Sequence, residues 1–547
     1  MIRQALGRVR QAQRTNASQS QTAVGRSVPA PVGGWNASSA LADMKPSDAV
    51  ILDNWIPRAA YVEIRKGTRA WVTGAPGPVE TLMTYRGSSP DELYAVSDGD
   101  VYDATSEGAA FESPVYTGLS NSRVQFRNFA NDGGQFLICV NGEDTPFRYN
   151  GSGWATLPIT GTSGSIILTS SNLIDVEMHK RRLFFVEKDS LRVWFLEVNA
   201  IQGEAQLLDL GPVFQLGGSL QCIGTWTLDN GTGVDDLIVF ITDQGEVAVY
   251  QGTDPADDTN WVLSGVYHVG IPLGRRALFK FGGDLNLLTT VGVIPLSQAL
   301  RVDRAQENTV AITAKIQNAF SQATQSYQDN FGWFGIAYQK GSLAIYNIPT
   351  VDLTEAEQYV QNLQTGSWCR FTGLNAICWA IADDNPYFGS PSGVYRWDTG
   401  VTDAGVTLTA DLKTAFNYFG DRGRQKRFTM LRPTLNTTAN IKPAVEMLVD
   451  FHEREPVAVP TTIIDRSLTL RIQENWTTVT GLGYCGAVRM RAALMLEAGI
   501  VSELAIGDGD LVGTGDGYTI ATDSGEPVDA QIQFISANVL FQPGGQL

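Results

Sequence analysis

The 547-residue sequence predicts an all-β fold, and three observations support this. Its 56 glycines and its aromatic fraction of 10% suit many tight turns between short, packed strands. Short apolar runs recur along the chain, each followed by a turn rich in Asp, Asn or Gly and then by a second strand, which is the pattern of a β-hairpin. The hairpins recur at intervals typical of a repeating β architecture.

Seven such hairpins lie between residues 79 and 405, at 91–105, 133–154, 180–198, 235–254, 283–297, 340–349 and 385–400. Their starts are separated by 42, 47, 55, 48, 57 and 45 residues. A four-stranded propeller blade takes roughly 40–50 residues. We therefore predict a β-propeller of about six to eight blades over 79–405. A large β-sandwich array is the alternative, because it would give a similar strand density and the intervals are irregular.

One segment of the chain departs from the β pattern. Residues 307–327 carry apolar side chains at helical spacing, namely Ile312, Ile316, Ala319, Phe320 and Ala323. This spacing predicts one amphipathic helix that packs on the propeller or on a neighbour. Core packing is its expected role.

The two ends of the chain differ from the predicted propeller. Residues 1–30 hold five arginines, no acidic residue and few large apolar groups, so they cannot bury a core of their own. Either this segment is a disordered tail, or it is an arm that becomes ordered against a neighbouring subunit. Residues 406–547 contain strand-like runs without the hairpin repeat, which indicates a second, non-repeating β domain.

The charge balance limits the classes of partner. The chain has 57 acidic and 40 basic residues, a net charge of −17. Tight nucleic-acid binding is disfavoured, because phosphate contacts need clustered cationic groups. An acidic surface repels DNA, as a conduit for a sliding duplex requires, and it also serves solubility. No run of about 18 apolar residues occurs, so we expect no membrane span.

The sequence contains none of the catalytic or metal-binding motifs that we sought. Its three histidines lie far apart, and its five cysteines form no Cys-x-x-Cys pair, so we expect no metal site and no disulfide framework. Neither a Gly-x-Ser-x-Gly elbow nor a phosphate-binding Gly-x-x-x-x-Gly-Lys loop is present. We therefore expect a protein that is not an enzyme and needs no cofactor.

Two acidic features of the sequence are expected to be structural and not functional. The carboxylate pairs Asp235–Asp236, Asp257–Asp258 and Asp383–Asp384 are expected in turns, where Asp caps local backbone groups. The Gly/Asp-rich segment 507–517 is similar to calcium-binding loops but lacks the EF-hand spacing and its terminal Glu. A flexible loop is favoured there over a calcium site.

The most distinctive segment spans residues 32–67. It contains Gly-Trp-Asn, then Leu-x-x-Met, Asp-Ala, Leu-Asp-Asn-Trp-x-Pro and Arg-x-Gly in that order. In this arrangement it resembles the opening of the tail tube and nozzle proteins of short-tailed bacteriophages. Residues 313–320 (TAKIQNAF), 367–400 and 423–435 (GRQKRFTMLRPTL) also resemble that group, so the resemblance extends over most of the chain in order.

The resemblance implies a β-propeller beside a β-rich platform domain formed from both chain ends, residues 31–78 and 406–547. It implies a structural virion protein of the tail, synthesised in the host bacterial cytoplasm. About six copies would surround the DNA exit channel, beside a tail adaptor or portal ring and tail fibres or spikes. DNA would pass without sequence-specific binding. The alternative is a receptor- or glycan-binding propeller, either lectin-like or a hydrolase.

Three groups of residues are candidates for contacts with a second subunit or partner. The first is the arginines of the N-terminal arm, Arg3, Arg8, Arg10 and Arg14. The second is Trp35 and Trp55, which, with Pro57, we expect to hold the N-terminal strand against the C-terminal domain; ordinary core packing is the alternative. The third is the densest basic patch outside the arm, which either contacts an acidic surface or DNA phosphate or is a solvated turn: Arg422, Arg424, Lys426 and Arg427.

Overall fold

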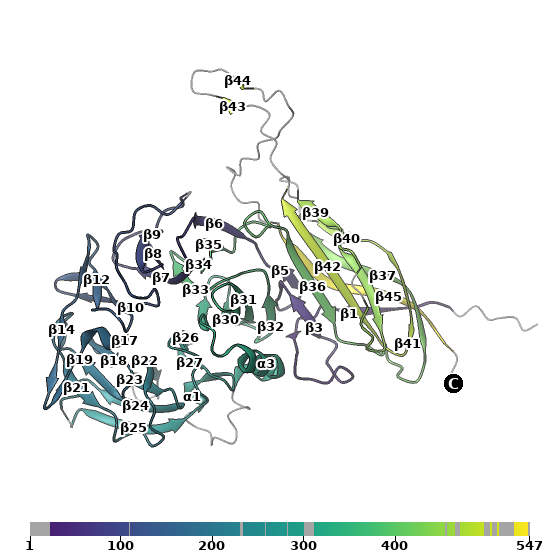
Figure 1. Cartoon of the computed structure of the whole chain (residues 1–547). Coiled ribbons are helices and arrows are strands. Elements are labelled where there is room, and N and C mark those ends of the chain that lie inside the picture. The colour runs from purple at the N-terminus through teal and green to yellow at the C-terminus, as the bar shows by residue number, and fades with distance from the viewer. Residues whose placement is uncertain are drawn as a thin grey trace, which may run out of the picture.

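The structure is a computed structural model with two bodies side by side, a ring of small sheets and an elongated β-sheet domain (Figure 1). It describes residues 22–544 except 109, 230–233, 258, 282, 300–310, 455–456, 465–470, 497–503, 506–510 and 513–529. The ring is a β-propeller and the second body is a β-rich platform, so the predicted all-β class is confirmed.

Six blades of the propeller are separate sheets. The first three are β7 (Val79–Tyr85), β8 (Glu92–Ser97), β9 (Asp100–Asp103); β10 (Gln125–Asn131), β11 (Gly134–Val140), β12 (Phe147–Tyr149), β13 (Trp154–Thr156); and β17 (Leu173–His179), β18 (Arg182–Glu187), β19 (Arg192–Phe195), β21 (Gln206–Asp209). The next three are β22 (Leu220–Asp229), β23 (Val234–Thr242), β24 (Glu246–Gly252), β25 (Trp261–His268); β26 (Leu278–Phe281), β27 (Asp284–Leu288), β28 (Val293–Pro295); and β33 (Cys378–Ala382), β34 (Asn385–Ser390), β35 (Gly393–Trp397), β6 (Thr68–Thr73).

The remaining sector of the ring is filled by four strands that belong to a larger sheet. These are β29 (Phe334–Tyr338), β30 (Leu343–Val351), β31 (Glu355–Asn362) and β32 (Trp368–Phe371). Strand β29 lies between β26 and β33, its neighbours on the two sides of the ring. All seven predicted hairpins thus lie within the ring, and the expected number of blades is confirmed.

The predicted turns have the backbone that a tight hairpin needs. Between β8 and β9, Asp98 and Gly99 have φ values of +49° and +79°, the conformation of a type I′ turn. Asp383 and Asp384 adopt φ values of +46° and +59° between β33 and β34. The expectation for Asp235–Asp236 was wrong, because both residues lie inside β23, where they pair with the end of β22.

The propeller is closed by a strand from the N-terminal region. Strand β6 runs antiparallel to β35, with Thr68 opposite Trp397, and so supplies the outer strand of the last blade. This strand falls within residues 31–78, the range that the sequence assigned to the platform. The structure thus places its last part in the ring, because a blade completed by both chain ends closes the circle with ladder hydrogen bonds.

The platform is built around two sheets. The first, here called the platform sheet, holds β4 (Trp55–Pro57), β5 (Val62–Ile64), β45 (Ile532–Pro543), β37 (Lys426–Thr437) and β40 (Arg471–Glu474), with β1 (Val24–Pro29) on β45 and β41 (Thr477–Gly483) on β37. Its two central strands are long and alternate buried with more exposed residues, as expected for one face against a core. Strands from both chain ends meet here, which confirms that both ends form the platform.

The second sheet joins the platform to the propeller. This joining sheet continues from β32 into β2 (Gly34–Trp35), β3 (Asp48–Asp53), β36 (Leu408–Thr414), β42 (Gly486–Leu496) and β38 (Ala444–Val449), with β39 (Thr461–Ile464) also on β42. Gly34 lies opposite both Asp48 and Trp368. Its φ is +85°, and an added Cβ would lie 2.6 Å from the Trp368 carbonyl oxygen, so only glycine fits. One continuous sheet therefore couples the two bodies.

The predicted helix is present. A 3₁₀ turn, η3 (Ile312–Ile316), leads directly into α3 (Gln317–Tyr327). Ile316, Phe320 and Ala323 are buried in the core shared by propeller and platform, which confirms the amphipathic pattern. The remaining short elements are η1 (Ser170–Asn172), α1 (Leu296–Ala299), β14 (Ile159–Thr160), β15 (Thr162–Ser163), β16 (Ile166–Ile167), β20 (Gly203–Glu204), β43 (Leu504–Ala505) and β44 (Leu511–Val512). Within the described residues, no helix is long and apolar enough to cross a membrane.

Candidate functional site

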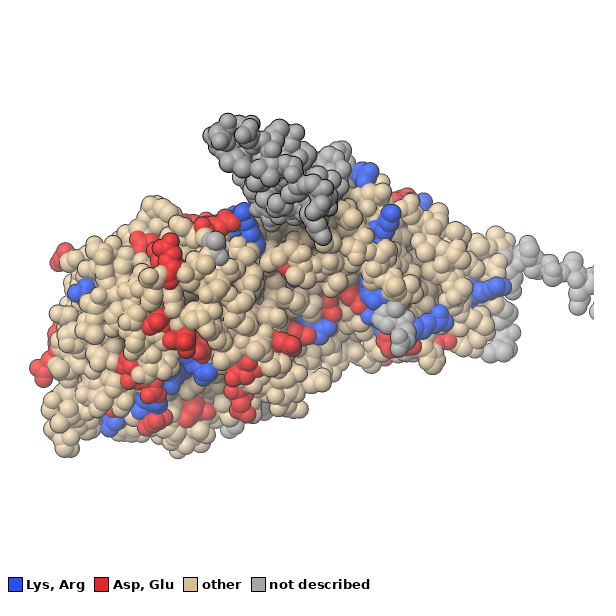
Figure 2. All heavy atoms as spheres, turned by 45° about the horizontal axis from the view of Figure 1, so that its top comes forward, with Lys and Arg blue, Asp and Glu red and all other residues tan. Residues whose placement is uncertain are grey.

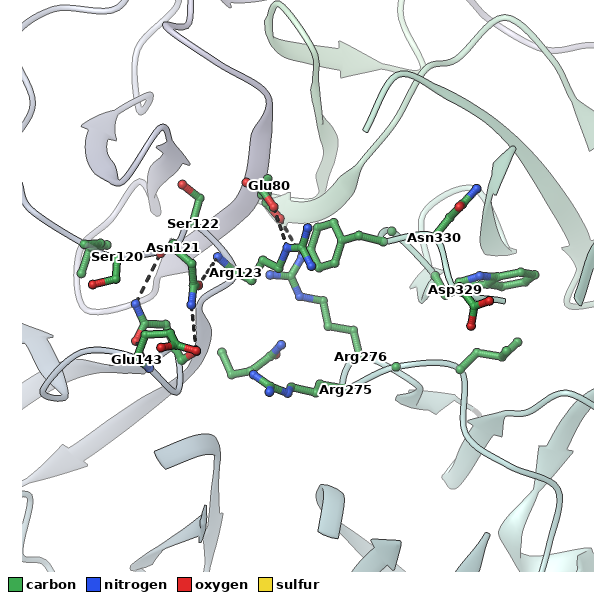
Figure 3. A pocket seen from close by; sticks show the side chains of 18 of the residues that line it. Glu80, Ser120, Asn121, Ser122, Arg123, Glu143, Arg275, Arg276, Asp329 and Asn330 are labelled. Atoms are coloured by element: carbon green, nitrogen blue, oxygen red, sulfur yellow. Dashed lines mark hydrogen bonds and ion pairs between the residues drawn. The ribbon is translucent and has the colours of Figure 1, made fainter. Parts of the chain in front are cut away.

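A large cavity lies on the propeller face at which the innermost strands begin (Figure 3). It measures about 690 Å³. Glu80 lies in β7, Gln125 in β10 and Gln221 in β22, while Arg275 and Arg276 precede β26. The opposite wall is the segment Phe331–Trp333, which connects α3 to β29. The cavity is therefore built from several blades that are far apart in the sequence.

Two arginines and one phenylalanine form a rigid wall of this cavity. The guanidinium carbons of Arg123 and Arg276 lie 4.3 and 5.2 Å from the ring centroid of Phe331, within the range of cation–π attraction. Arg123 Nε also donates to Glu80 Oε2 at 2.8 Å. Arg276 donates to the Glu80 carbonyl oxygen (2.8 Å), Thr81 Oγ1 (2.6 Å) and the Val124 carbonyl oxygen (3.1 Å). These contacts fix Arg276 across the boundary between β7 and β10.

Arg275 is held differently from its neighbour. It is half-buried and makes no hydrogen bond or ion pair with any residue that the structure describes. Burial lowers the pKa of its guanidinium, and the nearby carboxylates Asp175, Asp189 and Glu143 oppose that shift. In Figure 3 its side chain runs toward the side of the cavity where Asn121 and Glu143 lie, while Arg276 rises toward Arg123. Arg275 thus presents donors that its own chain does not use.

A smaller cavity of about 140 Å³ adjoins the large one and lies inside the ring. It is lined from the innermost strands, and Arg275 and Arg276 border both cavities. Here Asp175 accepts hydrogen bonds from the backbone N–H groups of Val176 (2.9 Å) and Ile223 (3.1 Å). Burial raises the pKa of Asp175 to about 7, against the opposing effect of Arg127. This cavity therefore borders buried charged groups and has room for only a few waters at roughly 30 Å³ each.

Trp35 and Trp55 lie inside the subunit. Their exposed fractions are 8% and 0%, and both belong to the core shared by propeller and platform. Trp35 packs edge-on against Tyr359 of β31, at 5.1 Å between ring centroids. The candidate role at a subunit interface is wrong for both residues, because a buried ring cannot reach another chain. They hold the N-terminal strands β2 and β4 within the fold, and Trp35 does so against β31 of the propeller side.

The basic patch at 422–427 is divided by the structure. Arg422 and Arg427 are exposed and Arg424 is half-buried, whereas Lys426 is 1% exposed. Lys426 Nζ donates to the carbonyl oxygens of Asp421, Arg424 (2.9 Å) and Tyr484 (2.9 Å). The prediction that Lys426 is an interface residue was therefore wrong, because its ammonium donors hold the turn before β37. The three arginines remain available at the surface.

The remaining candidates from the sequence are the N-terminal arginines, the 507–517 loop, the cysteines and possible metal ligands. Arg3, Arg8, Arg10 and Arg14, and the loop at 507–517 apart from the two residues of β44, lie outside the described residues. All five cysteines are buried free thiols, and burial raises the pKa of Cys378 to about 12. Within the described part of the chain, no group of three or more His, Cys, Asp or Glu side chains could hold a metal ion.

The residues of the large cavity were missed by sequence reasoning. They are spread from Glu80 to Trp333, and no motif connects them. The one local signal was the adjacent pair Arg275–Arg276 within a strongly acidic part of the chain.

Comparisons with known proteins find structural likeness alone. No family model matches the chain, and no curated protein matches it. A chain from the crystal structure of BBS1N in complex with ARL6DN is 11% identical, with a TM-score of 0.40, over 63% of this chain and 97% of that one. The structure of YCF48 bound to D1 peptide gives 11% identity and a TM-score of 0.35, over 61% and 97%.

A third similar structure is a family 43 glycoside hydrolase, an arabinoxylan arabinofuranohydrolase from Bacillus subtilis in complex with cellotetraose. It is 11% identical, with a TM-score of 0.25, over 87% of this chain and 96% of that one. At these TM-scores none of the three likenesses bears on function.

Proposed function

We propose that this chain is a structural virion protein, a subunit of the tail nozzle or tail tube of a short-tailed bacteriophage. In this proposal it is made in the host bacterial cytoplasm and becomes part of the virion tail. It is not an enzyme. About six copies form a ring around the DNA exit channel, in contact with an adaptor or portal ring and with tail fibres or spikes.

The observation that carries the proposal is the position of the residues behind the resemblance. Segment 32–67 crosses the junction between propeller and platform, and segments 313–320 and 367–400 meet it there. Lys315 Nζ donates to Asp48 Oδ1 at 2.8 Å, and Arg370 forms a bidentate pair with Asp53 at 2.9 and 2.7 Å. Residues that are far apart in the sequence, but that carry the same resemblance, thus bind one another at the junction between propeller and platform.

Arg65, from the Arg-x-Gly element, is the most completely engaged residue of this junction. It is 2% exposed, and its Nη1 and Nη2 donate to the two carboxylate oxygens of Asp403 at 2.8 and 2.6 Å. Its Nε donates to Asn54 Oδ1 at 2.8 Å, and Asn54 in turn donates to the carbonyl oxygen of Thr409 at 2.7 Å. A bidentate, buried arginine fixes orientation as well as distance, so propeller and platform have one relative arrangement. A ring built from repeated contacts needs such a rigid subunit.

The ring axis of the propeller is not the proposed DNA channel. A cavity of about 140 Å³ among buried charged side chains cannot admit a duplex. In the proposed assembly DNA therefore passes between subunits. The acidic surface of the chain, with its net charge of −17, would repel the duplex and let it slide.

The test is to image the purified full-length chain by electron microscopy and to measure its mass in solution by light scattering. We expect closed rings of about six copies around an open channel wide enough for a DNA duplex. Particles that stay monomeric at every concentration and salt condition would refute the proposal, as would rings closed at the centre.

A further inference from the structure

The large cavity on the propeller face contains polar groups that the fold itself does not use. The side chains of Arg275, Gln125 and Gln221 are half-buried and make no hydrogen bond or ion pair with any residue that the structure describes. The carboxylates of Asp98 and Asp329, which also line the cavity, are exposed and likewise have no bonded partner among the described residues. Buried or half-buried polar groups normally find partners within a protein or in a bound molecule. These side chains converge from five separate segments, and the three half-buried ones without partners indicate a ligand site.

The three arginines on one side of this cavity favour an anionic group there. Arg123, Arg275 and Arg276 lie close enough that the charges of Arg123 and Arg275 both lower the pKa of Arg276, after the larger effect of its burial. Only Arg123 has a carboxylate bonded to it, Glu80. Glu143, which also lines the cavity, is already paired with Lys188 at 2.6 Å. The guanidinium of Arg275 therefore has room and charge for an oxyanion.

The wall of the cavity formed by Phe331 and Trp333 is held in place by contacts within the fold. Phe331 is held by the two cation–π contacts, and its backbone N–H donates to Asp352 Oδ1 at 2.8 Å. Trp333 is 4% exposed, and its Nε1 donates to the Tyr327 carbonyl oxygen at 2.9 Å. A preformed pocket loses little conformational entropy when it binds a ligand. Its volume of about 690 Å³ suits one or two sugar rings.

We infer that this cavity binds a small acidic sugar. The carboxylate or phosphate of the sugar meets Arg275, and its hydroxyl groups meet the amides of Gln125 and Gln221 and the carboxylates of Asp98 and Asp329. A hydroxyl group both donates and accepts hydrogen bonds. It is therefore suited to amides, which also do both, and to carboxylates, which accept. A bare oxyanion would leave these groups unused. The inference stands on the cavity alone and goes beyond the proposed nozzle function.

The experiment is calorimetric titration of the full-length chain with four probes: glucuronic acid, glucose 6-phosphate, glucose and inorganic phosphate. We expect one site per chain, with at least one of the two acidic sugars binding 10-fold or more tightly than glucose and than inorganic phosphate. The better acidic sugar identifies whether the charge is a carboxylate or a phosphate. Arg275→Gln should weaken that sugar at least 10-fold, and Gln221→Ala should weaken it severalfold.

The matched control is Arg86→Gln. Arg86 is exposed at the end of β7, which puts it on the opposite face of the propeller, so this variant should bind the sugar as the unmodified chain does. Failure of both acidic sugars to bind, or equal binding by Arg275→Gln, overturns the inference. Inorganic phosphate binding as tightly as either sugar overturns it too, since the site would then recognise an oxyanion only. Ring formation is measured separately, so neither result depends on the other.

Discussion

Propeller and platform differ in charge as clearly as in architecture. Residues 68–405 hold 37 of the 57 acidic but only 19 of the 40 basic side chains, a formal net charge of −18. The rest of the chain holds 20 acidic and 21 basic side chains and is close to neutral. On the face shown in Figure 2, acidic side chains gather on the propeller half and basic ones are more frequent on the platform half.

The two regions also use their cations differently. In the propeller, Arg127, Arg182 and Arg192 are bound to carboxylates of their own blades or the next one. On the platform, Arg422 and Arg427 are exposed and Arg424 is half-buried, and the contacts of Arg422 and Arg424 with carboxylates are long, at 3.5 Å. Large apolar side chains are exposed on the same body: Ile463, Ile472, Trp476, Leu482 and Met495. Because the platform is close to neutral and carries both loosely paired arginines and exposed apolar side chains, it suits contact with an acidic neighbouring copy better than the propeller does.

The largest expected effect is on assembly. Reversing the three arginines of the basic patch, Arg422→Glu, Arg424→Glu and Arg427→Glu together, should abolish the proposed rings while leaving the monomer folded. Like charges would then face the acidic propeller of a neighbour. Light scattering and circular dichroism check the two halves of this expectation.

The matched control reverses three exposed bases of the propeller, Arg86, Arg181 and Lys340. This variant should still form rings. If both triple variants assemble normally, the assignment of subunit contacts to the platform is wrong.

The next effect tests the junction that joins the two regions. Arg65→Met should lower the free energy of unfolding by about 3–5 kcal/mol, because Asp403 and Asn54 lose their buried partner. Denaturant unfolding measures this change. Arg69→Gln, which removes an ion pair whose two side chains are more than a third exposed, should cost about 1 kcal/mol or less. An equal loss in the two variants would show that the junction is no stronger than the propeller surface.

The third effect is a pH dependence specific to the propeller axis. Because the pKa of Asp175 is raised by folding to about 7, the folded state binds a proton more tightly than the unfolded state. Stability from this group is fully present below about pH 4 and is lost as the pH rises through about 7. The slope is at most about 1.4 kcal/mol per pH unit for one proton.

Asp175→Asn should remove this slope and make the protein more stable than the unmodified chain at pH 8, with little difference at pH 4. Thermal unfolding across this range measures it. Parallel stability curves for the two proteins would contradict the assignment to Asp175.

The smallest expected effect is a difference in stability between variants of the buried Lys426 and of the exposed Arg427 in the basic patch. Lys426→Met should lower the free energy of unfolding by about 1–3 kcal/mol, since three backbone carbonyl oxygens lose a donor. Arg427→Gln should change it by about 0.5 kcal/mol or less, because the side chain is exposed. Denaturant midpoints of the two variants provide the comparison; a larger loss for Arg427→Gln would reverse our division of the patch.

The sequence by itself determined the local structure of this protein. Strand alternation and Asp-Gly turns such as Asp98–Gly99 predicted the hairpins, and the spacing of Ile316, Phe320 and Ala323 predicted the helix. These features were readable because their causes act over a few residues: backbone φ at a turn, and the side-chain period of a strand or a helix. The resemblance of segment 32–67 likewise lies in a short, continuous stretch.

Only the tertiary structure decided what each candidate side chain does. Lys426 and Arg427 are neighbours in one basic run, yet strand alternation turns the first inward and the second outward. Trp35 and Trp55 are buried by strands more than 300 residues away, and the cavity gathers Gln125, Gln221 and Arg275 from different blades. Burial and convergence depend on long-range packing, and no local pattern records which distant strand will lie beside a given residue.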